Sequence, residues 1–164
     1  MAEYTHIVHP FGPLYDGRSE ILILGSLPSV KSREQSFFYG HPRNRFWPLL
    51  AALFGEPAPA TVAEKRGLAL RHHVALWDTI YACDILGSSD SSIRNAVPTD
   101  LRPILAAAPI RRIFCNGGAS GLYYAKYQEK TLGRPALTLP STSPANAAWT
   151  MEKLLDAWRV IRET

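Results

Sequence analysis

Four short runs of apolar residues, each closed by glycine, proline or a polar residue, dominate the pattern of this chain. They cover residues 20–25, 73–77, 112–117 and 136–140. A run without polar alternation is typical of a strand that is buried on both faces, as in a parallel sheet. The four runs therefore predict a central, mainly parallel four-stranded sheet.

Segments with helical periodicity separate these runs. They cover residues 43–54, 60–71, 103–108, 119–126 and 149–161. In the second of them Thr61 and Glu64 have the spacing of a capping box, which favours a helix that begins there. Strands that alternate with helices favour right-handed crossovers and helices on both faces of the sheet. We expect one three-layer α/β/α sandwich domain over residues 1–164, with ordinary loops at 55–59 and 86–95.

The composition is that of a globular protein in water. Of the 164 residues, 46% are hydrophobic and 20% are charged, and no apolar run reaches the length of a membrane span. The first eleven residues lack the apolar segment of a signal peptide, so we expect a cytoplasmic protein with no membrane contact. The formal net charge of +4 slightly favours an anionic partner without identifying one. We expect a monomer.

The two cysteines do not form a metal-binding pattern. Cys83 and Cys115 are far apart, no CxxC is present, and no paired histidines lie nearby. This excludes the usual spacings of zinc and iron–sulfur sites. Each cysteine lies in an apolar stretch, so we expect two buried free thiols and neither a metal nor another cofactor.

Small polar residues gather where the predicted strands end. In an open parallel sheet, ligands bind outside the carboxyl ends of the strands. The segments at those ends are 25–29, 78–79, 116–118 and 140–144. We therefore expect the functional site at this edge of the sheet.

The segment Gly25-Ser26-Leu27-Pro28-Ser29 follows the first predicted strand. Gly25 and Ser26 can present backbone N–H groups and a hydroxyl to an anion or to the edge of a base, and Ser29 adds a second hydroxyl. The segment is not a Walker loop, because no Gly-Lys-Ser/Thr ends it. Taken alone, a plain turn that binds nothing explains it equally well.

Residues 37–47 combine aromatic, basic and amide side chains in an uncommon way. The faces of Phe38 and Tyr39 can stack on a base that has left the duplex, and Arg43 and Arg45 can hold phosphates. Asn44 lies between the arginines and offers both an acceptor and a donor, so it can orient a water molecule beside a sugar carbon. A local helix cap is the alternative for Asn44. Two further aromatic residues are expected in the core: Phe46 and Trp47.

Two later segments carry polar side chains at strand ends. In Asn116-Gly117-Gly118 the glycines let a ligand approach the backbone, and the amide of Asn116 can read a base edge with both of its polar atoms. An Asn-Gly turn without function is the alternative. The segment 139–147 is rich in hydroxyls and stiffened by prolines, so it can contact phosphates and enter a groove. Alternatively, Ser143 or Asn146 caps the last helix.

In this order the motifs resemble those of one family. The Gly-Ser-Leu-Pro-Ser turn, the block Tyr-Gly-His-Pro-Arg-Asn-Arg-Phe-Trp at 39–47 and the loop Ser-Thr-Ser-Pro-Ala-Asn at 141–146 are similar to those of the hypoxanthine-DNA glycosylases. These form family 6 of the uracil-DNA glycosylase superfamily. The segment 9–16 fits as well, and the Asn-x-Phe-Trp element is also similar to one in the mismatch-specific uracil and thymine glycosylases. The resemblance spans nearly the whole chain.

The resemblance implies a fold, an activity and a set of site residues. Enzymes of this family excise deaminated bases, chiefly hypoxanthine from deoxyinosine, without a metal, and their partner is double-stranded DNA that contains such a base. By similarity, Asn44 positions the hydrolytic water, Asn116 contacts the flipped base, and Phe38 or Tyr39 stacks on it. The last loop presses against the DNA backbone through Ser141, Thr142, Ser143, Pro144 and Asn146.

The chain departs from other branches of the superfamily in two places. Many members have an asparagine or a Gln-Asp pair in the loop after the first strand, and many uracil enzymes begin the last motif with a histidine. Here the loop is 25–29 and the last motif begins with Ser141. These differences fit the hypoxanthine family, and they leave His41 as a further candidate for a polar role or a DNA contact.

Several other functions stay open on the sequence. Within the class, the chain is alternatively a uracil or mixed-base (uracil/xanthine) glycosylase, or one with lyase activity through Lys31. From other classes, it is a non-catalytic nucleic-acid-binding domain or an α/β domain that binds a small phosphorylated metabolite.

Overall fold

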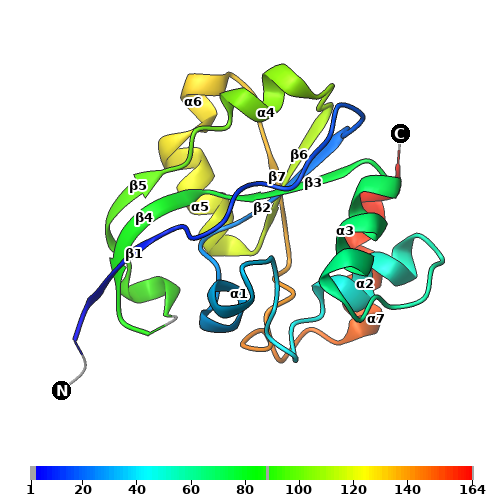
Figure 1. The fold of residues 1–164 in the computed structure, drawn as a ribbon, viewed down its shortest axis with the longest axis horizontal. Helices are drawn as coiled ribbons and strands as arrows, with labels where there is room; N and C mark the ends of the chain where they lie inside the picture. The colour runs from blue at the N-terminus through cyan, green and yellow to red at the C-terminus, as the bar shows by residue number, and fades with distance from the viewer. Residues whose placement is uncertain (1–2, 88, 164) are drawn as a thin grey trace.

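The computed structural model describes residues 3–87 and 89–163 and contains the expected parallel sheet. Its four strands lie in the order β3-β2-β6-β7, and all three pairings are parallel. Their carboxyl ends point to the lower side of Figure 1. The prediction of a central four-stranded parallel sheet is confirmed by strands close to the four apolar runs: β2 (Ile21–Gly25), β3 (Val74–Asp78), β6 (Arg112–Asn116) and β7 (Leu137–Leu139).

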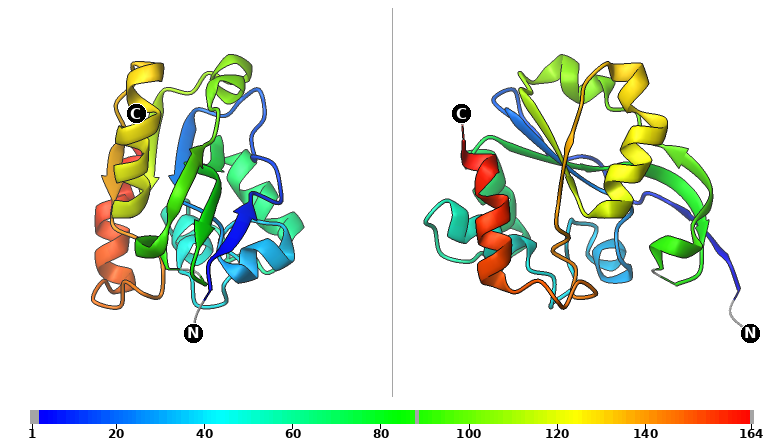
Figure 2. Two further views of the ribbon diagram at one scale, coloured as in Figure 1. Left: turned by 90° about the vertical axis from the view of Figure 1, so that its left-hand side faces the viewer. Right: turned by 180° about the vertical axis from the view of Figure 1, so that it is seen from behind.

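Helices cover both faces of this sheet, as Figures 1 and 2 show. One face is covered by α2 (Phe46–Leu53), α3 (Val62–Arg71) and α7 (Met151–Trp158). On the other face lie α5 (Gly118–Tyr127) and α6 (Glu129–Leu132), and α4 (Arg102–Ala107) lies at the amino end of β6. The capping box expected at the start of α3 is present, because Glu64 N–H donates to Thr61 Oγ1 and Thr61 N–H donates to Glu64. The chain ends in a 3₁₀ turn, η2 (Arg159–Arg162).

A second sheet, which was not predicted, extends β3 beyond the sandwich. It is antiparallel, with the order β1-β4-β5, and it consists of β1 (Thr5–Val8), β4 (Ile80–Ile85) and β5 (Arg94–Pro98). Only Thr79 separates β3 from β4, and its N–H donates to the Gly25 carbonyl at 2.8 Å. The same run of chain therefore belongs to both sheets. The expectation of a plain loop at 86–95 was wrong, since this segment contains η1 (Asp90–Ser92) and the start of β5.

The apolar runs were informative because their residues fill the core. Leu22, Ile23 and Leu24 of β2 are fully buried, and Phe46 and Trp47 belong to the same core, as expected. Cys83 and Cys115 are buried free thiols, as expected. Burial raises the pKa of Cys115 to about 11, so this thiol stays protonated at neutral pH. No helix within the described ranges is long and apolar enough to cross a membrane.

One glycine sets how closely α5 approaches the sheet. A Cβ atom at Gly121 would lie 2.2 Å from Thr138 Oγ1 and 3.2 Å from Thr138 Cγ2, in β7. Real Cβ atoms do not approach other atoms so closely, so the helix packs on this strand only because residue 121 has no side chain. The position of α5 in turn fixes the segment between Asn116 and the helix.

We expect Gly121→Ala to lower the free energy of unfolding by about 1–3 kcal/mol, because the added methyl group overpacks the contact with Thr138. This would occur although alanine is the better helix former. The matched control is Gly67→Ala in α3, where the nearest atom is the flexible end of Arg71 at 3.3 Å. That change should raise stability by up to ~1 kcal/mol. Urea denaturation measures both variants, and equal shifts would contradict the close contact.

Candidate functional site

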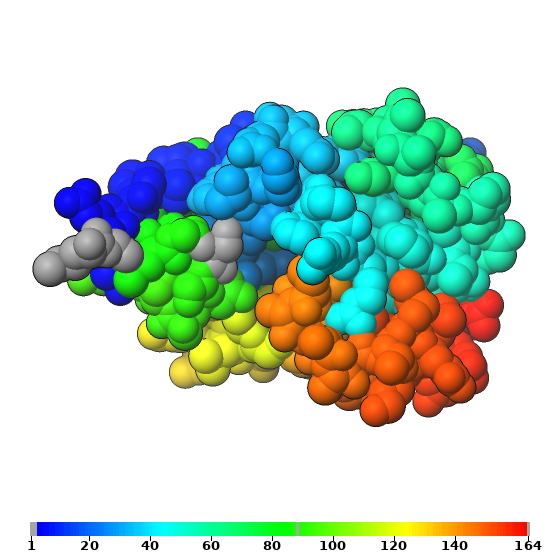
Figure 3. Space-filling view, turned by 90° about the horizontal axis from the view of Figure 1, so that it is seen from below, coloured from blue at the N-terminus to red at the C-terminus, as the bar shows by residue number. Residues whose placement is uncertain are grey.

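A cavity opens at the carboxyl ends of the parallel strands, where the sequence predicted a site. Its volume is about 410 Å³, within the range of small-molecule sites. Seen from below in Figure 3, the segments near residues 30, 40, 90 and 140 gather on this face. The predicted residues that line the cavity are Gly25, Ser26, Ser29, Phe38, Tyr39, His41, Asn44, Asn116, Ser141, Thr142, Ser143 and Pro144.

Asn44 and Asn116 are far apart in the sequence, and Thr142 links them by hydrogen bonds. The Nδ2 of Asn116 donates to Thr142 Oγ1 at 3.0 Å, and Thr142 N–H donates to Asn116 Oδ1 at 3.1 Å. Thr142 Oγ1 donates in turn to Asn44 Oδ1 at 2.8 Å. Thr142 is buried, so its hydroxyl fixes both amides in one orientation. In this structure Thr142 has an internal role, and its contact with DNA stays a prediction.

Asn44 both bonds to the start of α2 from just before its N-cap residue and forms a wall of the cavity. Its Oδ1 accepts from the N–H of Phe46, at 2.9 Å, in addition to the Thr142 hydroxyl. Both lone pairs of this oxygen are therefore engaged. Its Nδ2 donates to no residue within 3–87 and 89–163, so this amide nitrogen is the atom that can contact water. The two alternatives drawn from the sequence are thus compatible.

The floor of the cavity contains a buried carboxylate that the predicted site did not include. Asp78, at the end of β3, is 4% exposed and lines the cavity. Its Oδ2 accepts from Nε2 of the buried His9 at 2.7 Å. A Cβ atom at Gly25 would lie 2.5 Å from Asp78 Oδ1, so only glycine leaves room for the carboxylate. The signal was its place after a buried strand, at the same edge as Asn116.

The two aromatic candidates differ in what they offer to a ligand. Phe38 is 2% exposed and packs edge-on against Phe11, with the ring centroids 4.9 Å apart. Tyr39 stacks one face on Phe46 at 4.2 Å and has a φ of +54°. Burial, with a smaller effect from the charge of Asp78, raises the pKa of the Tyr39 hydroxyl well above its ordinary value. The phenol therefore remains a proton donor at neutral pH.

Arg45 fastens the last loop to the rest of the protein. Its guanidinium donates to the carbonyl oxygens of Ser143 at 2.9 Å, Asn146 at 3.0 Å and Trp149. These bonds hold the segment 143–149 beside the start of α2. The structure gives Arg45 this role in place of the expected phosphate contact, because three of its N–H groups bond to backbone carbonyls.

The predicted hydroxyl groups mostly organise their own loops. Ser29 Oγ accepts from the N–H of Ser32 and caps α1 (Val30–Gln35), a helix that was not predicted. Ser141 Oγ accepts from the Ser143 N–H, and Ser143 Oγ accepts from the N–H of Ala145. Neither Ser143 nor Asn146 starts the last helix, since Thr150 caps α7. At the cavity, Ser26 Oγ also donates a hydrogen bond to Asp90 Oδ1, at 3.2 Å.

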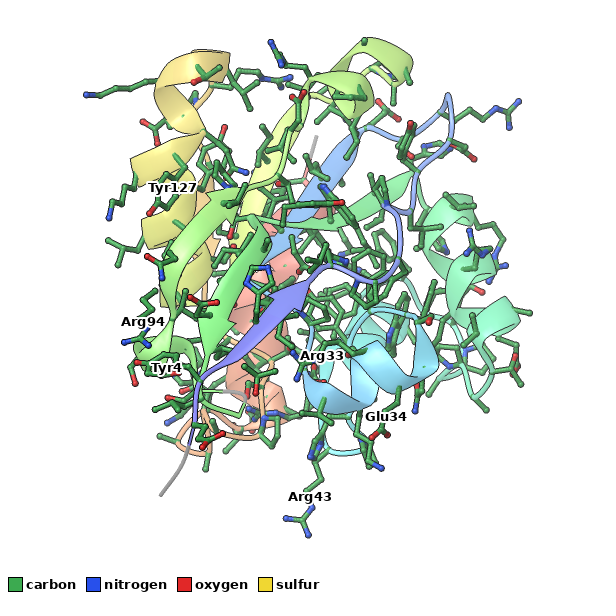
Figure 4. All side chains as sticks on the ribbon, turned by 60° about the vertical axis from the view of Figure 1, so that its left-hand side comes forward. Tyr4, Arg33, Glu34, Arg43, Arg94 and Tyr127 are labelled. Carbon is green, nitrogen blue, oxygen red and sulfur yellow. The ribbon has the colours of Figure 1, made fainter. Side chains whose placement is uncertain are left out.

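Basic side chains lie at the rim. Arg43 is exposed and extends away from the protein in Figure 4. His41 Nδ1 accepts from the N–H of Arg43 at 3.0 Å, which leaves Nε2 as the nitrogen that carries the proton. Lys31 Nζ lies 3.4 Å from Glu34 Oε2 in an exposed ion pair. Arg43 is therefore the basic group at the rim that no carboxylate pairs among the described residues, while the carboxylates of Asp78 and Asp90 line the cavity.

We expect Arg45→Ala to loosen the segment 143–149, because three backbone carbonyls lose their shared donor. Each lost bond to a charged group destabilises by about 1–3 kcal/mol in isolation, so the variant should unfold at lower denaturant. Hydrogen exchange measures the local effect, as faster exchange of amides in 143–149. Arg43→Ala is the matched control and should change neither property. Unchanged exchange in Arg45→Ala would contradict the fastening role.

Comparisons with known proteins agree with this geometry. The sequence matches the family model of the uracil DNA glycosylase superfamily over residues 12–162. It is 36% identical to a protein of Methanosarcina acetivorans named hypoxanthine DNA glycosylase, over 83% of this chain and 86% of the relative. A protein of Methanosarcina barkeri with the same name is 35% identical over the same shares.

The fold has a close counterpart among solved structures. A solution NMR structure from Methanosarcina acetivorans, described as a candidate uracil DNA glycosylase, superposes with a TM-score of 0.77 at 30% identity. The match covers 93% of this chain and 97% of that one. The resemblance expected from the motifs is thereby confirmed, together with the α/β fold. The chain belongs to the uracil DNA glycosylase superfamily.

Proposed function

We propose that the protein is a monofunctional DNA glycosylase that hydrolyses the glycosidic bond of a deaminated nucleotide in double-stranded DNA, with hypoxanthine as its main product. The names of two relatives support this substrate. The observation that carries the proposal is the shared cavity of Asn44 and Asn116, whose amides are locked together through Thr142. Separate surfaces for the two amides would have left no common place for a sugar and its base.

The reaction needs only modest chemistry from these side chains. Cleavage of an N-glycosidic bond builds positive charge on the sugar and negative charge on the departing base. Fixed hydrogen bonds around the base therefore stabilise the transition state more than the ground state. A cationic sugar accepts neutral water, so a strong general base is not required. DNA phosphates near the sugar can stabilise its positive charge directly.

Each polar group has a place in this scheme. Asn44 orients the water through Nδ2, since its Oδ1 is already engaged. Asn116 contacts the base through the second N–H of its amide, which Thr142 leaves free. Lys31 carries an ion pair with Glu34, which favours hydrolysis over a Schiff-base lyase step.

The rim fits the entry of a nucleotide from a duplex. A base reaches the cavity only after it leaves the stack, which costs a few kcal/mol and less for a poorly paired base. Arg43 can contact phosphates beside the opening, and the segment 141–146 is bonded to the neighbouring Arg45. DNA binding should weaken steeply as salt rises, whereas a metabolite-binding domain would show weak, salt-insensitive DNA binding.

The proposal is tested by incubating the protein with duplexes that contain inosine, uracil or xanthine and measuring the free base released. Release of hypoxanthine at the highest rate supports the proposal. A higher rate with uracil assigns the chain to the uracil or mixed-base alternative. Binding to inosine-containing DNA without base release makes it a non-catalytic binder.

We expect Asn44→Ser to reduce base release by about 10²- to 10³-fold, the usual effect of removing one preorganised donor. Serine keeps an oxygen that can accept the Phe46 N–H, so the helix cap and the stability should be largely retained. Asn44→Ala should lose a similar share of activity and about 1 kcal/mol of stability as well. Single-turnover rates and thermal unfolding separate the two effects. Full activity in Asn44→Ser would leave Asn44 as a cap only.

We expect Asn116→Ala to change the ranking of the substrates, because the amide contacts the base edge, which differs among inosine, uracil and xanthine. The panel of duplexes above measures this ranking. Asn116 also holds Thr142, so Thr142→Ala serves as the control for a displaced loop. A loss that is equal on all substrates, and equal in the two variants, would show that Asn116 acts only through the loop.

A further inference from the structure

The pair of His9 and Asp78 remains unassigned after the catalytic roles are distributed. Both side chains are buried, at 0% and 5% side-chain exposure. Asp78 lines the cavity, and His9 lies behind it, with its ring packed against Phe11 and Trp77. A buried carboxylate is costly unless it is paired, and its retention at a cavity floor points to a ligand contact. The chain contains a second such pair, His6 with Asp84, but that pair is exposed on the antiparallel sheet.

The hydrogen bonds indicate where the proton of the pair lies. His9 Nδ1 is buried and has no partner within residues 3–87 and 89–163. A buried N–H without an acceptor is rarer in proteins than an unused lone pair. The proton of the pair is therefore placed on His9 Nε2, which donates to Asp78 Oδ2. This bond leaves Asp78 Oδ1 as an acceptor that faces the cavity.

A donor lies beside this acceptor. Tyr39 Oη would be 3.3 Å from a Cβ atom at Gly25, and Asp78 Oδ1 would be 2.5 Å from the same atom. Both polar atoms therefore lie over Gly25. The Tyr39 hydroxyl is buried and lies beside the Asn116 amide, and no bond within normal hydrogen-bond geometry engages it among the described residues. Asp78 Oδ1 likewise accepts no hydrogen bond from them. The floor thus holds one unpaired acceptor and one buried hydroxyl side by side.

We infer that Asp78 and Tyr39 read the lactam edge of the flipped base, an inference that rests on the proposed glycosylase function. Hypoxanthine has a donor at N1–H next to an acceptor at O6. Asp78 Oδ1 accepts from N1–H, and Tyr39 Oη–H donates to O6. His9 is a positioning residue that aims the carboxylate. The hydrogen bond to O6 lies where negative charge gathers as the purine leaves.

This pairing rejects adenine by its chemistry. Adenine has a lone pair at N1 and an amino group in place of O6, so it sets a lone pair against the carboxylate and a donor against the phenol. Because the glycosidic bond fixes the base in one orientation, the two groups cannot be exchanged. A buried polar group left unpaired gives strong discrimination. Guanine shares the lactam edge, and its stronger pairing with cytosine makes it harder to flip.

The test compares inosine with nebularine, a purine that has a bare N1 and no oxygen at C6. Duplexes carry each base on a 2′-fluoroarabino sugar, which resists cleavage, so that binding is measured without base release. The wild-type protein should bind the inosine duplex at least about 10-fold more tightly. The same two bases on ordinary deoxyribose measure excision, which tests the proposed function separately.

Asp78→Asn should lower the inosine-to-nebularine ratio of affinities by about 10- to 100-fold. The amide oxygen takes the His9 proton, so an NH₂ group faces the cavity and suits the bare N1 of nebularine. Tyr39→Phe, which removes only the hydroxyl, should lower the ratio in the same direction. Asp84→Asn, at the exposed His–Asp pair, is the matched control and should leave the ratio unchanged.

Two results would overturn the inference. One is a wild-type protein that binds the two duplexes equally. The other is a ratio that stays at the wild-type value in Tyr39→Phe and in a folded Asp78→Asn protein. If the protein prefers inosine in binding but releases no base, the proposed glycosylase function is contradicted, while recognition of the lactam edge by Asp78 and Tyr39 is still supported.

Discussion

The parallel registration of β2 with its two neighbours is the constraint on which the site depends. Gly25 pairs with Asp78 on one side, and Leu24 pairs with Cys115 on the other. Asn116, which follows Cys115, therefore lies level with Gly25 and Asp78. A shift of one residue in either pairing would turn a side chain of the floor to the opposite face. The buried apolar runs fix this register, and the register determines where the polar side chains at the strand ends lie in the cavity.

The same polar atoms serve the fold and the site. Asn44 bonds to the first N–H of α2 and bounds the cavity, and Thr142 holds two amides while it anchors the last loop. Such double use fixes rotamers that a binding site needs, because each side chain is held from two sides. It also means that stability and activity must be measured together when any of these residues is changed.

The sequence allowed the parallel sheet, most helices and the positions of the two asparagines at the cavity to be predicted, because short apolar runs and strand-end polar residues are local signals. It did not reveal β4 or β5, whose short strands alternate imperfectly around Tyr81 and Asp84. Arg45 was misassigned because its carbonyl partners lie about a hundred residues away. Asp78 was noted at a strand end, but only its contact with His9, 69 residues earlier, marks it as part of the floor.

The fastened loop at 143–149 bears on how the protein and its substrate share the work of recognition. A segment already held by Arg45 loses little conformational entropy when it meets a ligand. In the proposed complex with DNA, the duplex therefore undergoes most of the deformation, at a cost that depends on how easily it deforms. In that complex, a rigid protein surface favours DNA sites where base pairs open easily. This selection precedes any hydrogen bond to the base itself.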